Sequence, residues 1–224
     1  MNRIFLTGDT HGGIDATKLH DARLEKLCKD DYIIVLGDFG YIFYANPDNA
    51  AEQYKLEWFK KQPYTTLFID GNHENHHRLN QYPISIWNGG KVHKINDSVI
   101  HLMRGQCFTI GDKTFFTFGG ADSIDKHLRR INFDWWIEEV PSYAEMDEGI
   151  ENANKIQHVD YILTHTAPNK IVHEMFNYHN DDPTEKMLNW YYDNLPFEHW
   201  YFGHFHEDKS YDKFTCLYNK LIEI

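Results

Sequence analysis

Continuous apolar runs recur along the chain, and each one ends at a small or polar residue. Three of them cover residues 3–7, 32–36 and 64–69, and two more cover 159–163 and 200–202. Runs of this kind are typical of strands that are buried on both faces. The pattern therefore predicts strands at the centre of the fold.

Segments with a helical period separate the first three of these strands. One covers residues 14–29, with Asp15 as its N-cap, and the next covers 48–62 and stops at Pro63. The predicted apolar face of the second helix consists of Ala51, Tyr54 and Trp58. The order strand, helix, strand, helix, strand predicts parallel βαβ units.

The middle of the chain has a different pattern. Short apolar runs at 99–103, 106–110 and 113–118 are separated by Arg-Gly and Gly-Asp turn sequences. They predict an antiparallel meander. A helix is predicted to begin at Ser142, because Glu145 three residues later completes a capping box.

The last part of the chain predicts one more helix and a closing hairpin. The helix covers 185–195, and the hairpin joins 214–218 to 221–224. The chain contains no internal repeat, low-complexity tract or linker. We therefore expect a single α/β domain over residues 1–224.

The composition is that of an ordinary globular protein with an acidic surface. The 224 residues are 42% hydrophobic and carry a formal charge of −12, which disfavours duplex nucleic acid and anionic membranes as partners. No apolar stretch is long enough to cross a bilayer, and the N-terminus lacks the layout of a signal peptide. Cys28, Cys107 and Cys216 are far apart in the sequence, so we expect reduced thiols in a cytoplasmic protein.

Polar residues of the kind that bind metals follow the apolar runs. The predicted strands end at Gly or Thr beside Asp, Asn or His. The residues concerned are Asp9, His11, Asp38, Asn72, His165, His204 and His206. Ligands of open α/β sheets bind beyond the carboxyl ends of the strands, so these strand ends together indicate one shared site.

This set of side chains suits the hydrolysis of a phosphate ester. Two divalent ions about 3.5–4 Å apart activate water and neutralise the phosphoryl oxygens, and a carboxylate is the usual bridge between them. Mixed nitrogen and oxygen ligands select transition metals over Ca²⁺, and the absence of cysteine from these motifs disfavours a thiolate zinc site. We expect two divalent metal ions, with Mn²⁺ as the first choice and Fe, Zn, Co or Ni as alternatives.

The order of these residues resembles that of the calcineurin-like metallophosphoesterase superfamily. The motifs are Asp-x-His at 9–11, Gly-Asp at 37–38, Gly-Asn-His-Glu at 71–74, a lone His165 after a strand, and Gly-His-x-His at 203–206. Each motif is weak alone, but their occurrence in this order is specific. The resemblance implies a four-layer α/β/β/α sandwich, in which two mixed β-sheets pack face to face with helices outside.

The resemblance also implies a role for each residue. One metal takes Asp9, His11 and His206, the other takes Asn72, His165 and His204, and Asp38 bridges the two. A hydroxide between the ions attacks phosphorus. His73 acts near the leaving oxygen, as a general acid or as a hydrogen-bond donor.

A narrower resemblance is to a group that is common in phages, prophages and Gram-positive bacteria. Its members are labelled Ser/Thr phosphatase-like, a label that implies little about substrate. The similar stretches are 71–75, 79–83, 87–91, 102–105 and 119–126. This resemblance implies a bacterial or phage-encoded protein of the cytoplasm.

One departure from the pattern of phosphoprotein phosphatases bears on the substrate. Those enzymes extend the second motif to Gly-Asp-x-Val-Asp-Arg-Gly, in which the second Asp orients the motif histidine and the Arg grips phosphate. Here Tyr41 and Ile42 take these two places. His73 therefore lacks its usual carboxylate partner, and Tyr41 and Glu74 are the candidate substitutes.

Phosphate still needs a cationic grip, and a guanidinium group suits it best. The candidates for substrate binding are Arg129, Arg130, Lys126 and Arg78, with Arg104 as a further one. We favour segment 123–130, and the alternative for it is a solvated helix face. Trp135 and Trp136, which follow, are interpreted as core packing in preference to a nucleobase platform.

The leading hypothesis is a two-metal enzyme that hydrolyses phosphomonoesters or phosphodiesters, either of a small molecule or of a phosphopeptide. Its alternatives are a Ser/Thr phosphoprotein phosphatase and a cyclic or dinucleotide phosphodiesterase of nucleotide signalling. A non-enzymatic scaffold that binds phosphate is disfavoured, because the ligand positions and His73 are all present. The sequence leaves the oligomeric state open.

Overall fold

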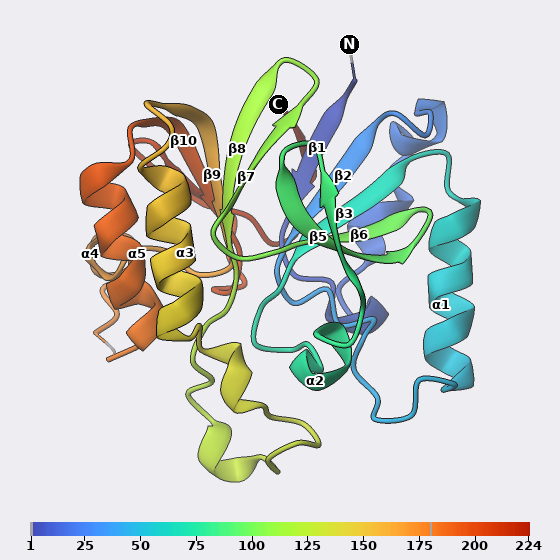
Figure 1. Cartoon of the computed structure of the whole chain (residues 1–224). Coiled ribbons are helices and arrows are strands. Elements are labelled where there is room, and N and C mark those ends of the chain that lie inside the picture. The colour runs from blue at the N-terminus through green and yellow to red at the C-terminus, as the bar shows by residue number, and fades with distance from the viewer. Residues whose placement is uncertain (1, 180) are drawn as a thin grey trace.

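Two mixed β-sheets form the centre of the molecule in the computed structural model, which describes residues 2–179 and 181–224 (Figure 1). The first sheet contains, in spatial order, β13 (Ile222–Glu223), β1 (Ile4–Thr7), β2 (Tyr32–Leu36), β3 (Thr65–Ile69), β6 (Val99–Leu102), β5 (Gly90–Asn96) and β4 (Ile84–Trp87). The second contains β11 (Lys209–Tyr211), β12 (Phe214–Cys216), β10 (Phe197–Phe202), β9 (Val159–Thr164), β8 (Lys113–Phe118) and β7 (Gln106–Ile110). The inner strands of each sheet run parallel, and its outer strands are antiparallel to their neighbours.

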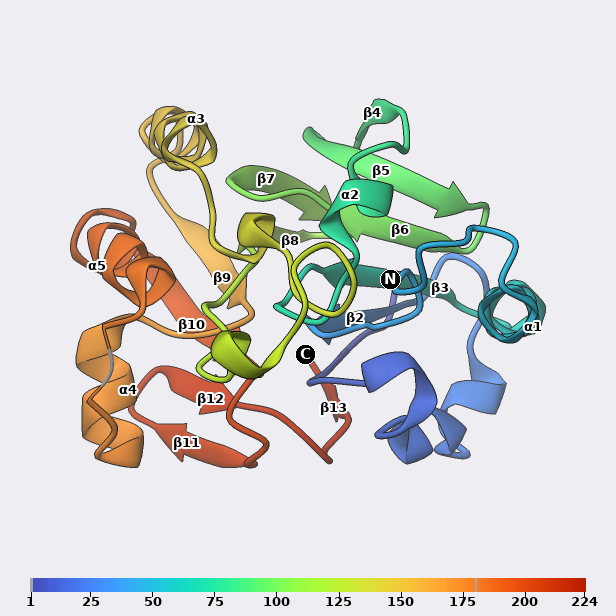
Figure 2. The ribbon, with the colours of Figure 1, turned by 90° about the horizontal axis from the view of Figure 1, so that it is seen from below.

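Helices cover the outer faces of both sheets. The helices are α1 (Ala50–Lys61), the single turn α2 (His76–Leu79), α3 (Tyr143–Ala153), α4 (Asn169–Phe176) and α5 (Pro183–Asn194). Viewed from below, α3, α4 and α5 lie outside the second sheet and α1 lies outside the first (Figure 2). The predicted four-layer α/β/β/α sandwich is therefore confirmed. Among the described residues, no helix combines the length and the apolar character needed to cross a bilayer.

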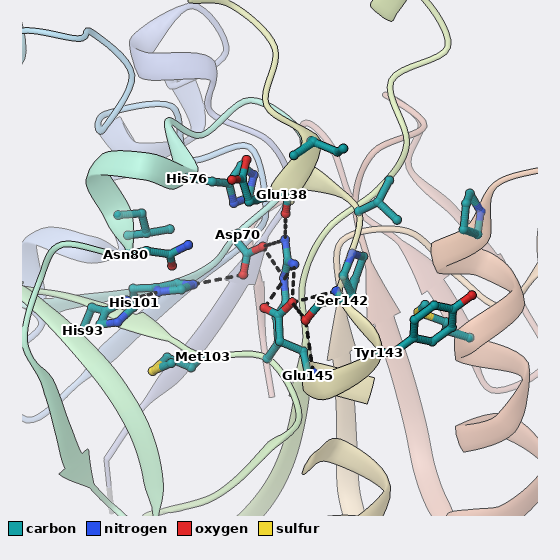
Figure 3. A pocket seen from close by; sticks show the side chains of 17 residues that line it. Asp70, His76, Asn80, His93, His101, Met103, Glu138, Ser142, Tyr143 and Glu145 are labelled. Atoms are coloured by element: carbon teal, nitrogen blue, oxygen red, sulfur yellow. Dashed lines mark hydrogen bonds and ion pairs between the residues drawn. The ribbon is translucent and has the colours of Figure 1, made fainter. Parts of the chain in front are cut away.

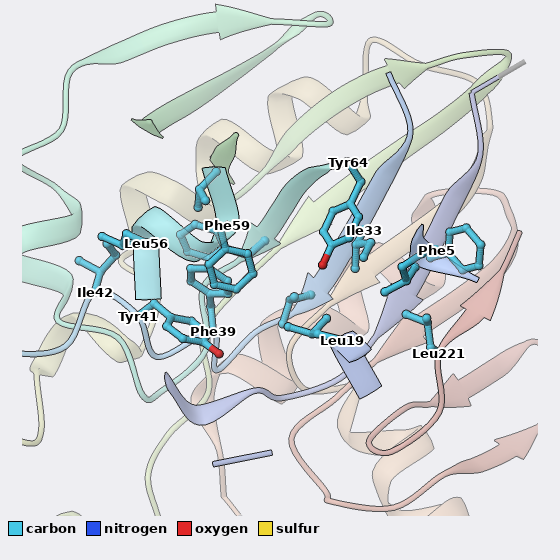
Figure 4. Close-up of a cluster of buried hydrophobic side chains, with 14 of the residues drawn as sticks. Phe5, Leu19, Ile33, Phe39, Tyr41, Ile42, Leu56, Phe59, Tyr64 and Leu221 are labelled. Carbon is cyan, nitrogen blue, oxygen red and sulfur yellow. The ribbon is translucent and has the colours of Figure 1, made fainter. Parts of the chain in front are cut away.

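Three apolar clusters hold these layers together. The cluster between the sheets combines residues of the first sheet, such as Leu36 and Ile69, with residues of the second, such as Phe115 and Leu163. A second cluster fills the space between α1 and the outer face of the first sheet (Figure 4). The third lies under α3, α4 and α5 and includes the fully buried Trp200. Burial on both faces explains why the central strands read as continuous apolar runs.

The helix predicted over residues 14–29 is wrong. That segment forms only short 3-10 turns, at Thr17–His20 and Leu24–Lys26. The side chain of Asp21 accepts the backbone N–H of Arg23 (2.8 Å), a local bond that competes with helical pairing. Asp15, predicted as the N-cap, instead has its carboxylate 2.6 Å from Nδ1 of His11.

The predicted inner face of α1 is correct for Trp58, which packs against the apolar cluster, but wrong for Ala51 and Tyr54. Tyr54 is 76% exposed, whereas Glu52, Leu56 and Phe59 are buried. Glu52 reaches inward because its carboxylate forms an ion pair with Arg78 (2.6 Å). Because Glu52 is charged, the sequence pattern does not mark its position as buried. Its partner Arg78 is distant in the sequence, so the local pattern does not indicate the pair.

The predicted meander and closing hairpin are corrected by the strand pairing. β6 pairs with β3 and β5 in the first sheet, while β7 and β8 form a hairpin in the second. In the same way, β12 pairs with β10 and β13 pairs with β1. The chain crosses between sheets in both places. In contrast, the helix that begins at Ser142 is confirmed with its complete capping box.

Candidate metal centre

Five parallel strands end at the same rim of the sandwich. In the first sheet, β1, β2 and β3 lead to Asp9, Asp38 and Asn72, and in the second, β9 and β10 lead to His165 and His204. His11 and His206 follow two residues after Asp9 and His204. The seven residues predicted as ligands therefore come together where the two sheets meet.

The carboxylate of Asp38 lies between histidines of both sheets. Its Oδ2 is 3.2 Å from Nε2 of His11, and its Oδ1 is 3.4 Å from Nε2 of His165. Oδ1 also accepts the backbone N–H of His73 (2.8 Å). Asp38 is 1% exposed, so its charge acts on these groups with little screening by water.

Asp9, His11 and His206 form one group of potential ligands, whose donor atoms all lie within 4.8 Å of one another. Oδ1 of Asp9 accepts the backbone N–H of His204 (3.0 Å). Oδ2 of Asp9 lies 3.1 Å from Nε2 of His206 but is fully buried without a hydrogen bond. A buried carboxylate oxygen in this state suits a cation as its partner.

Asn72, His165 and His204 form a second group on the other side of Asp38. Nε2 of His165 lies 3.1 Å from Oδ1 of Asn72 and 3.2 Å from Nδ1 of His204. The amide nitrogen of Asn72 donates to the hydroxyl of Ser123 (3.1 Å). That bond turns the amide oxygen, the atom that binds metals, toward the histidines.

In His165 and His11, Nδ1 is hydrogen-bonded to other groups of the chain, which leaves Nε2 as the nitrogen that can bind a metal. Nδ1 of His165 lies 2.8 Å from the carbonyl oxygen of Leu36, and Nδ1 of His11 lies 2.6 Å from a carboxylate oxygen of Asp15. Both acceptors fix a proton on Nδ1, so Nε2 keeps its lone pair for a metal. Asp15 is thus a partner of His11 that sequence reasoning missed.

The backbone of the site adopts a conformation that is uncommon outside glycine. His11, Asp38, His204 and His206 have φ values of 43°, 47°, 68° and 52°. Such positions cluster at functional sites, where the surrounding structure enforces them. At Gly71, an added Cβ would lie 2.2 Å from Oδ1 of Asp38. Glycine is therefore required there for the turn to approach this carboxylate.

Charges in the cluster shift the pKa values of its histidines in both directions. Burial opposes protonation of His165, but the carboxylates of Asp38 and Asp9 outweigh it and raise the pKa of that ring to about 10. The same competition raises the pKa of His11 to about 9. Burial and the charge of His165 lower the pKa of His204 to about 4. Protons and metal ions therefore compete for the same ring nitrogens.

These donors fit two divalent ions. They comprise carboxylate oxygens, imidazole nitrogens and an amide oxygen, with no thiolate among them. Asp38 has one oxygen toward each group, an arrangement that suits a carboxylate bridge.

His73 adjoins the cluster, and an arginine lies along its ring. The centroid of its ring is 5.1 Å from that of His11. The two terminal nitrogens of Arg129 lie 3.3 Å from the two ring nitrogens of His73, and Arg129 pairs with Asp125 (2.8 Å). Burial lowers the pKa of His73, and the Arg129 charge acts in the same direction while Asp38 opposes both.

The two residues considered as substitutes for the missing carboxylate have other contacts. The carboxyl of Glu74 accepts the backbone N–H groups of Gly40 (3.0 Å) and Gly71 (2.6 Å). The ring of Tyr41 packs against Phe39 and Phe59. Arg129 therefore occupies the position beside His73, and it carries the opposite charge to the carboxylate of the phosphoprotein phosphatases.

The other predicted phosphate-binding cations are engaged elsewhere. Lys126 pairs with Asp122 (2.7 Å), and the guanidinium of Arg130 lies over the ring of Phe133. Arg78 is 8% exposed and bound to Glu52, so the structure does not bring it to the metal centre. Trp136 is 1% exposed, in agreement with its interpretation as core packing.

A further layer of contacts behind Asn72 was missed by sequence reasoning. Ser123 donates its hydroxyl to Glu139 (2.9 Å), and Trp135 donates its indole N–H to the same carboxylate (2.8 Å). Burial raises the pKa of Glu139 to about 7. No local signal links these residues to Asn72, because they lie far from it in the sequence.

Arg104 belongs to a second charge cluster, which lines a cavity of about 610 Å³ with Asp70, His101 and Glu145 (Figure 3). Asp70 binds Arg104 (2.6 Å) through one oxygen and His101 (3.0 Å) through the other. Arg104 also reaches Glu145 (3.2 Å). The charge of Arg104 outweighs burial and holds the pKa of Asp70 well below its usual range.

One comparison with known proteins shows the family of the chain. A family model described as calcineurin-like phosphoesterase matches residues 2–208. A search of solved structures finds the phosphopantetheinyl hydrolase PptH from Mycobacterium tuberculosis, with 14% sequence identity, a TM-score of 0.49, and coverage of 96% of this chain and 87% of that one. No curated protein matches the sequence significantly. From the extent of the family match, which covers most of the chain, the protein belongs to the calcineurin-like phosphoesterase family.

Proposed function

We propose that the chain is a phosphoesterase that works with two divalent metal ions held by Asp9, His11 and His206 on one side, Asn72, His165 and His204 on the other, and Asp38 between them. The observation that carries the proposal is the position of Asp38, whose two oxygens face histidines of different sheets. When bound, the metals supply an activated water and neutralise charge on the phosphoryl oxygens.

The residues of the chain position the substrate and the leaving group. Arg129, fixed by Asp125, offers a guanidinium group next to the cluster for an oxygen of the phosphoryl group. His73 stands between Arg129 and His11, close enough to donate a hydrogen bond to the leaving oxygen. Its lowered pKa favours the neutral ring before substrate binds.

A small-molecule phosphoester is favoured over a phosphoprotein. Phosphoprotein phosphatases carry an Asp and an Arg after the second motif, where this chain has Tyr41 and Ile42. Both of these residues are buried in the apolar cluster beneath α1. They do not present a carboxylate to His73 or a cation to phosphate, so that part of the protein phosphatase apparatus has no counterpart at these positions.

The proposal is tested by metal removal and by Asp38→Asn. Metal-depleted protein should be inactive on chromogenic aryl phosphomonoesters and diesters, and Mn²⁺ should restore turnover. Asp38→Asn should lower turnover by about 10³-fold, since removal of a group that holds the charge-stabilising machinery has effects of this order. Its matched control is Asp97→Asn, at an exposed position outside the site. Full activity of Asp38→Asn, or turnover that survives chelation, would contradict the proposal.

A further inference from the structure

Two pockets border the candidate metal centre. The first, the His11-side pocket, has a volume of about 460 Å³ and includes Ile14, Tyr41, Phe43 and Tyr44 in its lining. The second, the His204-side pocket, has a volume of about 440 Å³ and includes Ile124, Phe176, Tyr178 and Phe205. His73 and His206 line both, so the two pockets meet at the place where a phosphoryl group would bind.

Each pocket has an apolar wall with exposed side chains. In the His11-side pocket, Ile14 is 83% exposed and Tyr44 is 50% exposed. In the His204-side pocket, Ile124 is 71% exposed and Tyr178 is 40% exposed. Apolar groups left open beside a polar reaction centre are typical of surfaces that bind the organic part of a ligand.

Neither pocket has a surplus of cations among its lining residues once the metal centre is set aside. The first contains Lys55 together with Asp15 and with Glu52, which is paired with Arg78. The second contains Arg129, which is paired with Asp125, together with Glu207. This balance disfavours substrate arms that carry additional phosphates, because such arms need a surplus of cations around them.

We infer that the substrate is a phosphodiester with two uncharged organic arms, one in the His11-side pocket and one in the His204-side pocket. This inference rests on the proposed function and adds the substrate class to it. Water gives its hydroxyl group to phosphorus and its hydrogen to the leaving oxygen. One P–O ester bond breaks, and the products are a phosphomonoester and an alcohol. A phosphomonoester has a single organic arm and leaves one of the two pockets empty.

The test compares two substrates that release the same chromophore, bis(p-nitrophenyl) phosphate and p-nitrophenyl phosphate, on the Mn²⁺-loaded full-length protein. Tyr44→Ala and Tyr178→Ala each remove one exposed aromatic side chain, from a different pocket. Each should lower kcat/KM for the diester about tenfold, as expected for the loss of one apolar contact with a substrate group. Only one of the two variants should also lower kcat/KM for the monoester. In the other variant, the ratio of kcat/KM for the diester to kcat/KM for the monoester should fall.

Tyr54→Ala is the matched control, because Tyr54 is 76% exposed on α1 and lies outside both pockets. Equal losses on both substrates in both variants, or no loss on the diester in either one, would overturn the inference while leaving the proposed phosphoesterase intact. Absence of turnover on both substrates by the metal-loaded wild type would overturn the proposed function itself.

Discussion

Two buried clusters, one around Asp70 and one around Asp38, combine carboxylates with histidines. The negative charges of the two clusters are balanced in different ways. In the cluster around Asp70, Arg104 supplies a permanent positive charge with fixed geometry. In the cluster around Asp38, the nearest positive charges are protons on His11 and His165. The charge of Asp70 is therefore balanced by a side chain with a permanent charge, whereas the charge of Asp38 is balanced by protons that a metal ion can displace.

The difference distinguishes a structural cluster from the proposed metal site. Arg104 cannot lose its proton in a protein and has bonds to Asp70, Glu145 and backbone carbonyls of the segment before α3. The protons of His11 and His165 are on nitrogens that can bind a divalent ion in their place. A perturbed pKa alone therefore does not identify a functional site. In this protein, the two clusters are distinguished by the kind of positive charge that balances the carboxylate, which is an arginine in one and displaceable protons in the other.

The largest effect on this comparison is expected from Arg104→Met, which removes the permanent charge of the Asp70 cluster. Asp70 is 1% exposed, and breaking a buried pair by deletion of one partner costs about 3–5 kcal/mol. Urea unfolding should show this loss. Arg3→Met is the control, since its pair with Glu223 is at the surface, where ion pairs contribute little to stability. Similar losses in the two variants would show that the Asp70 cluster is not a structural ion pair.

A medium effect is expected from pH, and it has opposite signs in the two clusters. The raised pKa values of His11 and His165, about 9 and about 10, mean that the folded metal-free protein keeps protons that the unfolded chain loses above pH 6.5. The stability of the metal-free protein should therefore fall from pH 6.5 to 8, by up to about 1.4 kcal/mol per pH unit for each proton. The lowered pKa of Asp70 has the reverse sign, with stability lost in acid as pH falls below the usual Asp range.

Unfolding curves over this pH range, with and without Mn²⁺, check the prediction. Bound metal replaces the histidine protons, so the decrease between pH 6.5 and 8 should be smaller in its presence. Calorimetry in buffers of different ionisation enthalpy should also detect protons released on metal binding. Stability that rises with pH in the metal-free protein, or metal binding without proton release, would contradict the assigned balance of charges.

The smallest effect is expected from Ser142→Ala at the start of α3. The carboxylate of Glu145 accepts from Ser142 in the capping box and also binds Arg104, so the cap supports the Asp70 cluster. Loss of the N-cap hydroxyl should cost about 1 kcal/mol, whereas Ser142→Gly should cost only a few tenths. Thermal unfolding measures both. Unchanged stability of Ser142→Ala would argue against a role for the hydroxyl.

Local patterns were sufficient for the central strands and for α3. Strands such as β2 and β3 are buried on both faces, so their apolar runs are visible without any knowledge of neighbours. The capping box of α3 is formed by residues three positions apart. The motif order also indicated the family, which the match over residues 2–208 confirms.

Other features depend on partners that are distant in the sequence. Arg78, Arg104 and Arg129 are chemically identical, yet two are bound in buried ion pairs and one lies beside His73. Strand β6 was grouped with β7 and β8 because they are adjacent in the sequence, but it pairs with β3 in the other sheet. Residues 14–29 do not form the predicted helix, and side chains of this segment bind groups elsewhere in the chain. Lys18, for example, donates hydrogen bonds to the carbonyl oxygens of Asp9 and Tyr218.

The residues of this protein specify where strands are buried and which side chains are able to bind metals, because both properties depend on short stretches of chain. The tertiary structure decides which charges meet, since Coulomb interactions depend on distance and burial after folding. It brings Asp38 between histidines of two sheets and puts Arg104 against Asp70. The two pockets beside the metal centre also exist only after the strand ends and loops have come together.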